Sequence, residues 1–201
     1  MDLNAIKAAT WHLHVRAERG GIIADILTGR ATRFGLALLL RNLLPVYRVL
    51  DGSFYGGPPL ARSEAIEADL RHLSPGDVPP LLPEGAAYAA RVTSLASYNV
   101  GELLAHAYVR YLGDLNGGRI LRDRVHRCIG EAATELLFHD HIGIDDISQF
   151  ATSYRCRLEN DIPPAGFERV AREVPIAFAL NIALSEAVHR HALAKLGDRP
   201  S

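Results

Sequence analysis

A helical stretch with three glycines places the strongest constraint on how this chain can fold. Residues 103–122 have the composition of a helix and contain Gly113, Gly117 and Gly118. A glycine inside a helix costs about 1 kcal/mol relative to alanine, so such a helix needs a compensating interaction. At about 100° per residue, Gly113 and Gly117 lie within about 40° of each other. A strip without side chains lets the backbone touch or kink over a flat ligand, or pack closely against another helix.

Polar residues flank this bare strip. Arg110 and Asp114 are four residues apart, so they can pair on one face of the helix, and His106 lies on the same side. Asp114 is at the edge of the strip, where its carboxylate can reach a small polar group of a ligand. The spacing alone leaves both a ligand-binding face and a helix–helix contact open.

Residues 108–118 read Tyr-Val-Arg-Tyr-Leu-Gly-Asp-Leu-Asn-Gly-Gly and closely resemble the distal-helix motif of the haem oxygenase family. The family pattern is usually Tyr-Thr-Arg-Tyr-Leu-Gly-Asp-Leu-Ser-Gly-Gly, so the departures are Val109 and Asn116. The match keeps every glycine and the aspartate, which makes it highly specific. The residues that the resemblance places against a haem are Tyr108, Gly113 and Gly117.

Residues 10–18 resemble the proximal helix of the same family, where a His-x-x-Ala-Glu pattern supplies the axial iron ligand and its glutamate partner. The resemblance implies that His14 binds the iron and that Glu18 is its partner. The spacing agrees, because Glu18 follows His14 by four residues and can receive the second imidazole N–H. His12 faces elsewhere on the helix. The resemblance also places Lys7 opposite a haem propionate.

Shorter segments extend the resemblance as far as the last predicted helix. Tyr47 falls where the family has a tyrosine in the distal hydrogen-bond network, although an ordinary core aromatic would look the same. Arg155 matches an arginine that pairs with a propionate. Phe178 and Asn181 match residues that line the haem pocket, and core packing also explains Phe178. Ala151 departs from the family, because many members have a propionate-facing lysine there.

Composition is that of an ordinary globular protein. A chain of 201 residues and 21.9 kDa with 48% hydrophobic residues is most simply one domain, spanning 1–201. The formal net charge of −1 and the lack of a basic block argue against a nucleic-acid partner. The start of the chain has no secretory signal, and the longest apolar run, 36–40, is too short to span a membrane. Cys128 and Cys156 form no disulfide framework, which predicts a cytoplasmic protein.

No run of strict alternation between turn signals indicates a strand, so the predicted fold is all-α. The resemblance further implies that the haem lies between a proximal helix and a glycine-kinked distal helix. We expect Asp2 to cap the first helix, Pro45 to bend the third, and Pro175 to kink or divide the last. The helices expected are 2–19, 22–27, 32–50, 63–73, 86–91, 94–126, 131–138, 146–158 and one from Pro163-Pro164 to 196.

The resemblance implies an enzyme that cleaves haem to biliverdin, carbon monoxide and ferrous iron, with haem as both substrate and cofactor. Asp114, acting through ordered water, is expected to deliver protons, with Arg110 and Tyr47 orienting that network. The reaction needs O2 and electrons. The sequence has no flavin, nicotinamide or cluster motif, so an external donor is implied, either a ferredoxin or a flavoprotein reductase.

Two alternatives belong to other functional classes. A haem carrier or sensor of the same fold would bind haem without turnover, but it has no use for a carboxylate beside the distal glycines. A di-iron bundle requires two Glu-x-x-His motifs and two further glutamates. Only one such motif is present, from Glu186 to His189.

Overall fold

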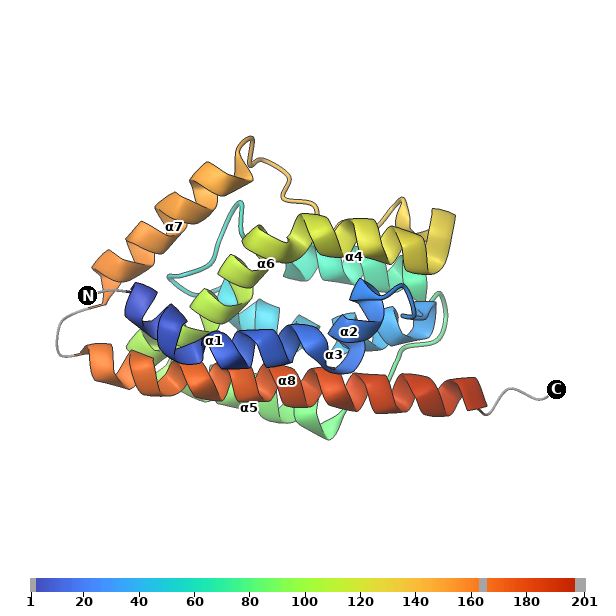
Figure 1. The fold of residues 1–201 in the computed structure, drawn as a ribbon, viewed down its shortest axis with the longest axis horizontal. Helices are drawn as coiled ribbons and strands as arrows, with labels where there is room; N and C mark the ends of the chain where they lie inside the picture. Colours follow the sequence, from blue (N-terminus) through green and yellow to red (C-terminus); the bar gives the residue numbers. More distant parts are fainter. Residues whose placement is uncertain (1–2, 163–165, 198–201) are drawn as a thin grey trace.

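The computed structural model describes residues 3–162 and 166–197, and within these two ranges the chain is helical with no strand (Figure 1). This confirms the all-α prediction. The elements are α1 (Leu3–Arg19), α2 (Gly21–Leu27), α3 (Arg33–Asp51), α4 (Ser63–Leu73), α5 (Pro83–Tyr98), α6 (Val100–Ile129), the 3-10 helix η1 (Gly130–Ala133), α7 (Ile147–Asp161) and α8 (Phe167–Gly197).

The long helix α8 forms the base on which the other helices pack. It contacts α1, α2, α3, α5 and α6, and Figure 1 shows α1 lying along it. The helix α6 changes direction partway along its length, where its colour passes from green to yellow in Figure 1. One cluster of buried apolar side chains includes members of all eight α-helices. None of the helices in 3–162 and 166–197 combines the length and hydropathy needed to cross a lipid bilayer.

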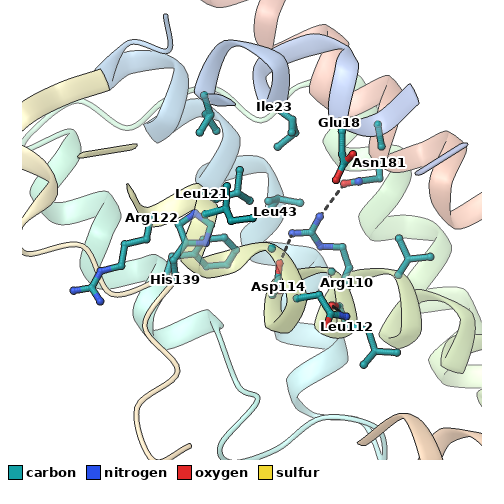
Figure 2. A pocket seen from close by; sticks show the side chains of 18 of the residues that line it. Glu18, Ile23, Leu43, Arg110, Leu112, Asp114, Leu121, Arg122, His139 and Asn181 are labelled. Carbon is teal, nitrogen blue, oxygen red and sulfur yellow. Dashed lines mark hydrogen bonds and ion pairs between the residues drawn. The ribbon is translucent and has the colours of Figure 1, made fainter. Parts of the chain in front are cut away.

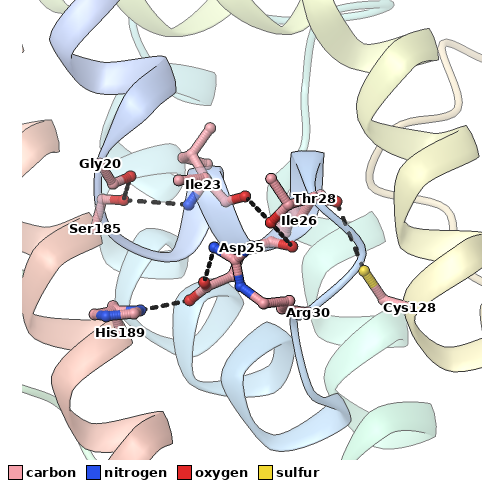
Figure 3. A network of polar contacts seen from close by, with 10 residues as sticks. Gly20, Ile23, Asp25, Ile26, Thr28, Arg30, Cys128, Ser185 and His189 are labelled. Carbon is pink, nitrogen blue, oxygen red and sulfur yellow. Dashed lines mark hydrogen bonds and ion pairs between the residues drawn. The ribbon is translucent and has the colours of Figure 1, made fainter.

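A close approach between α2 and α8, where Ser185 lies beside Gly20 and Ile23 (Figure 3), sets the direction in which the chain leaves α1. Gly21 has a φ of +59°, a conformation that favours glycine. A Cβ atom at this position would lie 2.5 Å from the carbonyl carbon of Ser185 and 2.6 Å from its oxygen. The predicted break at Gly20-Gly21 is therefore confirmed, because only glycine allows α2 to pack this closely on α8.

A buried amide joins α3 to the start of α5. Asn42 is fully buried and donates to the carbonyls of Leu38 (2.8 Å) and Pro80 (3.1 Å). Its Oδ1 accepts from the backbone N–H of Leu82 at 2.7 Å, one residue before α5 begins. Gly85 lies directly against Asn42, since an added Cβ would be 3.0 Å from the Asn42 side-chain carbons. These contacts fix α3, which carries Tyr47, relative to α5.

The helix predicted over 131–138 is wrong. Only Gly130–Ala133 forms a short 3-10 helix, and the chain then runs through turns to α7. The backbone N–H groups of Leu137 and Phe138 donate to the carboxylate of Asp69 in α4, at 2.7 and 2.9 Å. A helix over these residues would direct the same N–H groups to its own carbonyls, so the contact with α4 replaces helical hydrogen bonds.

Two further boundaries differ from the prediction. The helix expected over 94–126 is divided at Asn99, whose backbone (φ −140°, ψ 60°) is not helical, so α5 extends to Tyr98. Pro175 does not divide α8, and α3 likewise continues through Pro45, so the predicted bend at Pro45 and kink at Pro175 stay predictions. The expected cap at Asp2 and the break at Pro163-Pro164 lie outside the described residues.

Replacing Gly21 with alanine should destabilise the protein more than the same change at Gly29. Both glycines have positive φ, so each substitution carries a backbone penalty of about 1 kcal/mol. Only at Gly21 would the new methyl group also meet another helix, whereas nothing lies within 4 Å of the position at Gly29. For Gly21→Ala we therefore expect the free energy of unfolding to fall by about 1–3 kcal/mol more than for Gly29→Ala. Urea unfolding followed by helical circular dichroism measures both variants, and equal losses would contradict the close-approach explanation.

Candidate active site

A cavity of about 760 Å³ lies between α1 and α6 and is closed by residues of α2, α3, α7 and α8. Its volume is within the range typical of ligand pockets. Figure 2 shows Glu18 of α1 on one side of this space, with Arg110 and Asp114 of α6 on the other. The predicted site residues that line the cavity are Lys7, His14, Glu18, Tyr108, Arg110, Gly113, Asp114, Gly117, Arg155, Phe178 and Asn181.

The three glycines of α6 have two different environments. A Cβ atom added at Gly113 or Gly117 would meet nothing within 4 Å, and both residues line the cavity. An added Cβ at Gly118 would lie 3.2 Å from His141 Nε2. Gly113 and Gly117 therefore form an open face toward the cavity rather than a helix–helix contact. Gly118 instead allows residues 139–141 to pack against the helix.

A buried network links α3, α6 and α8 directly beside this open face. The Tyr47 hydroxyl donates to Asp114 Oδ2. Arg110 donates to the Tyr47 oxygen through Nε (3.0 Å) and Nη2 (2.7 Å), and its Nη2 lies 3.3 Å from Asp114 Oδ1. Through Nη1 it also donates to Asn181 Oδ1 at 2.9 Å. Tyr47 lies behind the cavity wall rather than in it, so its role is to hold Asp114 and Arg110 in place.

The surroundings shift the pKa values of Tyr47 and Arg110. Burial raises the pKa of Tyr47 well above its usual value, and Asp114 raises it further against the opposing effect of Arg110. Burial acts to lower the pKa of Arg110, but Tyr47 and Asp114 outweigh it and the pKa is raised. Tyr47 is therefore a hydroxyl donor and Arg110 a cation at neutral pH. An ionised carboxylate only accepts hydrogen bonds, and its remaining lone pairs are available to the cavity.

On the opposite side, His14 is held by aromatic contacts. Its ring stacks on Trp11, with centroids 5.1 Å apart, and the edge of Phe178 approaches it at 6.4 Å. The His14 side chain is 43% exposed, and its Nδ1 has no hydrogen-bond partner among the described residues. The distance from Nδ1 to Glu18 Oε1 is 3.8 Å, longer than a hydrogen bond. The predicted contact with Glu18 is therefore not formed at this distance.

Two predicted cations, Lys7 and Arg155, stand at the α1 and α7 side of the cavity. Lys7 is exposed, whereas Arg155 donates to Asn4 Oδ1 and lies 3.7 Å from Glu159. Burial raises the pKa of Tyr108, which also lines this region, and the charge of Arg155 opposes that shift. Ala151 lines the cavity without adding a charge.

The placement of His106 differs from the sequence expectation. The helical spacing put His106 on the same side as the glycines, but it is fully buried and absent from the cavity wall. Its Nε2 lies 3.0 Å from Glu173 Oε1 in α8. Burial acts to raise the pKa of Glu173, but hydrogen bonds from His106 and Arg91 lower it to about 2. His106 therefore joins α6 to α8 through a buried charged group.

Sequence reasoning missed His139, which lines the cavity from the turns after η1. Burial lowers its pKa to about 3, and the nearby charges of His141 and Arg110 add to the effect. No motif or helical spacing marks this residue, because the backbone hydrogen bonds to Asp69 determine the conformation of its segment.

Comparisons with known proteins agree with this geometry. A family model described as Heme oxygenase matches residues 2–187. The chain belongs to the haem oxygenase family. It is 31% identical to heme oxygenase 1 of Pongo abelii over 200 residues, covering 90% of this chain and 69% of that protein. Haem degradation is the activity supported for this family, and haem is both substrate and prosthetic group.

Solved haem oxygenase structures show the same fold. Heme oxygenase-1 of Synechocystis sp. in complex with heme is 28% identical, with a TM-score of 0.83 and coverage of 96% of this chain and 95% of that one. Heme oxygenase-2 of the same organism, in complex with heme and NO, has a TM-score of 0.86 and covers 98% and 93% of the two chains. At 23% identity, this second likeness supports the fold alone.

The cavity residues fit a haem. The imidazole of His14 lines the cavity from α1 and makes no hydrogen bond to a described residue, and the backbone at Gly113 and Gly117 offers a surface without side chains on the opposite side. Lys7 and Arg155 supply positive charge at the rim. Within 3–162 and 166–197, no three His, Cys, Asp or Glu side chains are placed to hold a metal ion.

Replacing Gly117 with alanine should have opposite effects on stability and on haem binding. The new methyl group meets no atom in the haem-free protein and improves helix propensity, so unfolding should require up to about 1 kcal/mol more. It also projects into the cavity and should weaken haem binding. Denaturation and haem titration measure the two effects. The matched variant Gly101→Ala has open space but lies outside the cavity wall, so it should leave haem binding unchanged. Unaltered haem affinity in Gly117→Ala would show that this face does not contact haem.

Proposed function

We propose that this protein, acting as one cytoplasmic domain, cleaves haem to biliverdin, carbon monoxide and ferrous iron. The reaction would use O2 and electrons from an external donor, a ferredoxin or a flavoprotein reductase. The observation that carries the proposal is the Asp114 carboxylate, held by Tyr47 and Arg110 directly beside the open glycine face of the cavity. A protein that only binds haem does not need a buried carboxylate acceptor at this point.

Different residues around the cavity would bind different parts of the haem. His14 would hold the iron through its imidazole, with Trp11 and Phe178 fixing the plane of the ring. A small rotation of the exposed Glu18 side chain would bring its carboxylate within reach of His14 Nδ1 and set the tautomer. Lys7 and Arg155 would pair with the propionates. Bound haem supplies both the redox-active iron and the ring that is opened.

Asp114 would act on protons through water. Tyr47 and Arg110 hold its two oxygens from behind, which leaves the cavity side of the carboxylate free to accept from a water molecule. A water held in this way points its second hydrogen toward the glycine face, where the haem would lie. Because Tyr47 and Arg110 keep their protons, the proton that is delivered would come from the water, which would regain a proton from solvent. Arg110 in turn is fixed by Asn181.

The proposed reaction is tested by loading the protein with haemin, supplying electrons and air, and identifying the released pigment. We expect biliverdin. In His14→Ala, turnover should be lost and should recover with added imidazole, because the cavity left by the side chain can hold that ligand. A haem spectrum that reverts unchanged after each cycle of reductant and air would identify a carrier or sensor instead.

Replacing Asp114 with alanine should separate haem binding from haem cleavage. We expect near-parental haem affinity, since no proposed contact to iron or propionate is lost, and a rate of biliverdin release lower by about 100-fold. Reductant should still be consumed. Asp114→Asn keeps the shape of the side chain and should be less impaired. Asp123→Ala removes an exposed carboxylate of the same helix and serves as the control. Parental biliverdin release from Asp114→Ala would contradict the assigned role.

A further inference from the structure

The inner end of the cavity contains a polar side chain to which no function has been assigned. We define the inner end by the cavity-lining residues Leu121, Val125, Leu136, Phe138 and His139. All except His139 are apolar and cannot form hydrogen bonds through their side chains. Figure 2 shows His139 among the residues around this space, with Arg122 extending away from Asp114.

His139 lies close to the helical turn that carries Asp114. Its Nδ1 would be 3.9 Å from a Cβ atom at Gly118, one turn after Asp114 in α6. The neighbouring His141 Nε2 lies 3.2 Å from the backbone oxygen of Asp114 itself. The imidazole and the carboxylate therefore belong to the same cavity and to adjoining parts of its wall.

The imidazole is neutral at physiological pH. Burial is the main cause of its low pKa, and the charges of His141, Arg110, Arg62 and Arg122 all act in the same direction. A neutral imidazole has one N–H donor and one acceptor nitrogen. Its Nδ1 is buried without a hydrogen-bond partner among the described residues, and no described group bonds to Nε2. The residues in the described part of the chain thus satisfy neither nitrogen.

Hydrogen bonds hold the backbone on both sides of His139. Asp69 holds the N–H groups of Leu137 and Phe138, and Arg62 Nη1 donates to the carbonyl of Asp140 at 2.6 Å. Restraints therefore lie on both sides of the residue. A polar group that lacks a hydrogen bond destabilises the folded state, so a molecule in the cavity is the available partner for Nε2, the ring nitrogen that is not buried. The cavity of about 760 Å³ has room for water, and the polar side chains of Asp69 and Arg122 line it as well.

We propose that His139 is a positioning residue that holds an ordered water molecule at the inner end of the cavity. This water would extend the water chain on which Asp114 acts, so that the chain is anchored at two points in the wall. The effect of this water on catalysis rests on the proposed function. The water site itself belongs to the haem-free protein and can be tested without turnover.

The first experiment compares crystal structures of the haem-free parent, His139→Gln and His139→Phe at a resolution that shows water. We expect a water within hydrogen-bond distance of the imidazole in the parent and of the amide in His139→Gln, and none at this position in His139→Phe. No water on His139 in the parent overturns the proposal, whether or not the phenylalanine variant folds.

The second experiment records the absorption spectrum of the ferric haem complex across a range of pH. The quantity measured is the midpoint, the pH at which half of the spectral change has occurred. Loss of the anchored water should shift this midpoint by about half a pH unit in His139→Phe and should leave His139→Gln near the parent. His126→Phe removes an exposed imidazole outside the cavity wall and is the matched control. Biliverdin release should fall about five-fold in His139→Phe alone. An unshifted midpoint overturns the proposal, whereas a parent that releases no biliverdin refutes the proposed function instead.

Discussion

The buried ion pair between Arg110 and Asp114 is the interaction on which the site depends. Removing two charges from water is costly, and the cost is offset only when hydrogen bonds satisfy the remaining donors and acceptors. Tyr47 and Asn181 provide those bonds, one from α3 and one from α8. Three helices that are distant in sequence therefore meet at one charged contact, and the same bonds that satisfy the pair aim the carboxylate at the cavity.

This arrangement explains why α6 tolerates its glycines. At Gly113 and Gly117 no neighbouring side chain or backbone compensates for the low helix propensity, since an added methyl group would meet only open space. The helix is kept in place by other contacts, including the Arg110 network and the buried pair of His106 with Glu173. Stability is thus supplied by polar contacts behind the helix, while the cavity side stays bare. Gly118, in contrast, allows residues 139–141 to pack against the helix.

Much of this site was predictable because it is local in sequence. Helical periodicity relates Arg110 to Asp114 and His14 to Glu18, and motif resemblance named other residues that line the cavity, such as Tyr108 and Asn181. The residues that sequence reasoning misplaced or missed depend on contacts that are distant in sequence. The inward turn of His106 depends on Glu173 in another helix, and the non-helical segment that carries His139 depends on Asp69 in α4. Such tertiary contacts override local propensity, and no spacing within the segment reveals them.

The two sides of the cavity differ in how far they are arranged before haem binds. On the α6 side, Asp114 is buried, Arg110 is only slightly exposed, and the two already bond to each other and to Tyr47. On the α1 side, His14 is partly exposed and its contact with Glu18 is not yet made. Groups that act on protons benefit most from being fixed in advance, because no reorganisation is then needed during reaction. The α1 side can become ordered when haem binds, at some cost in haem affinity. This side can then still open to release the product. The structure thus places its rigidity where the proposed chemistry requires it.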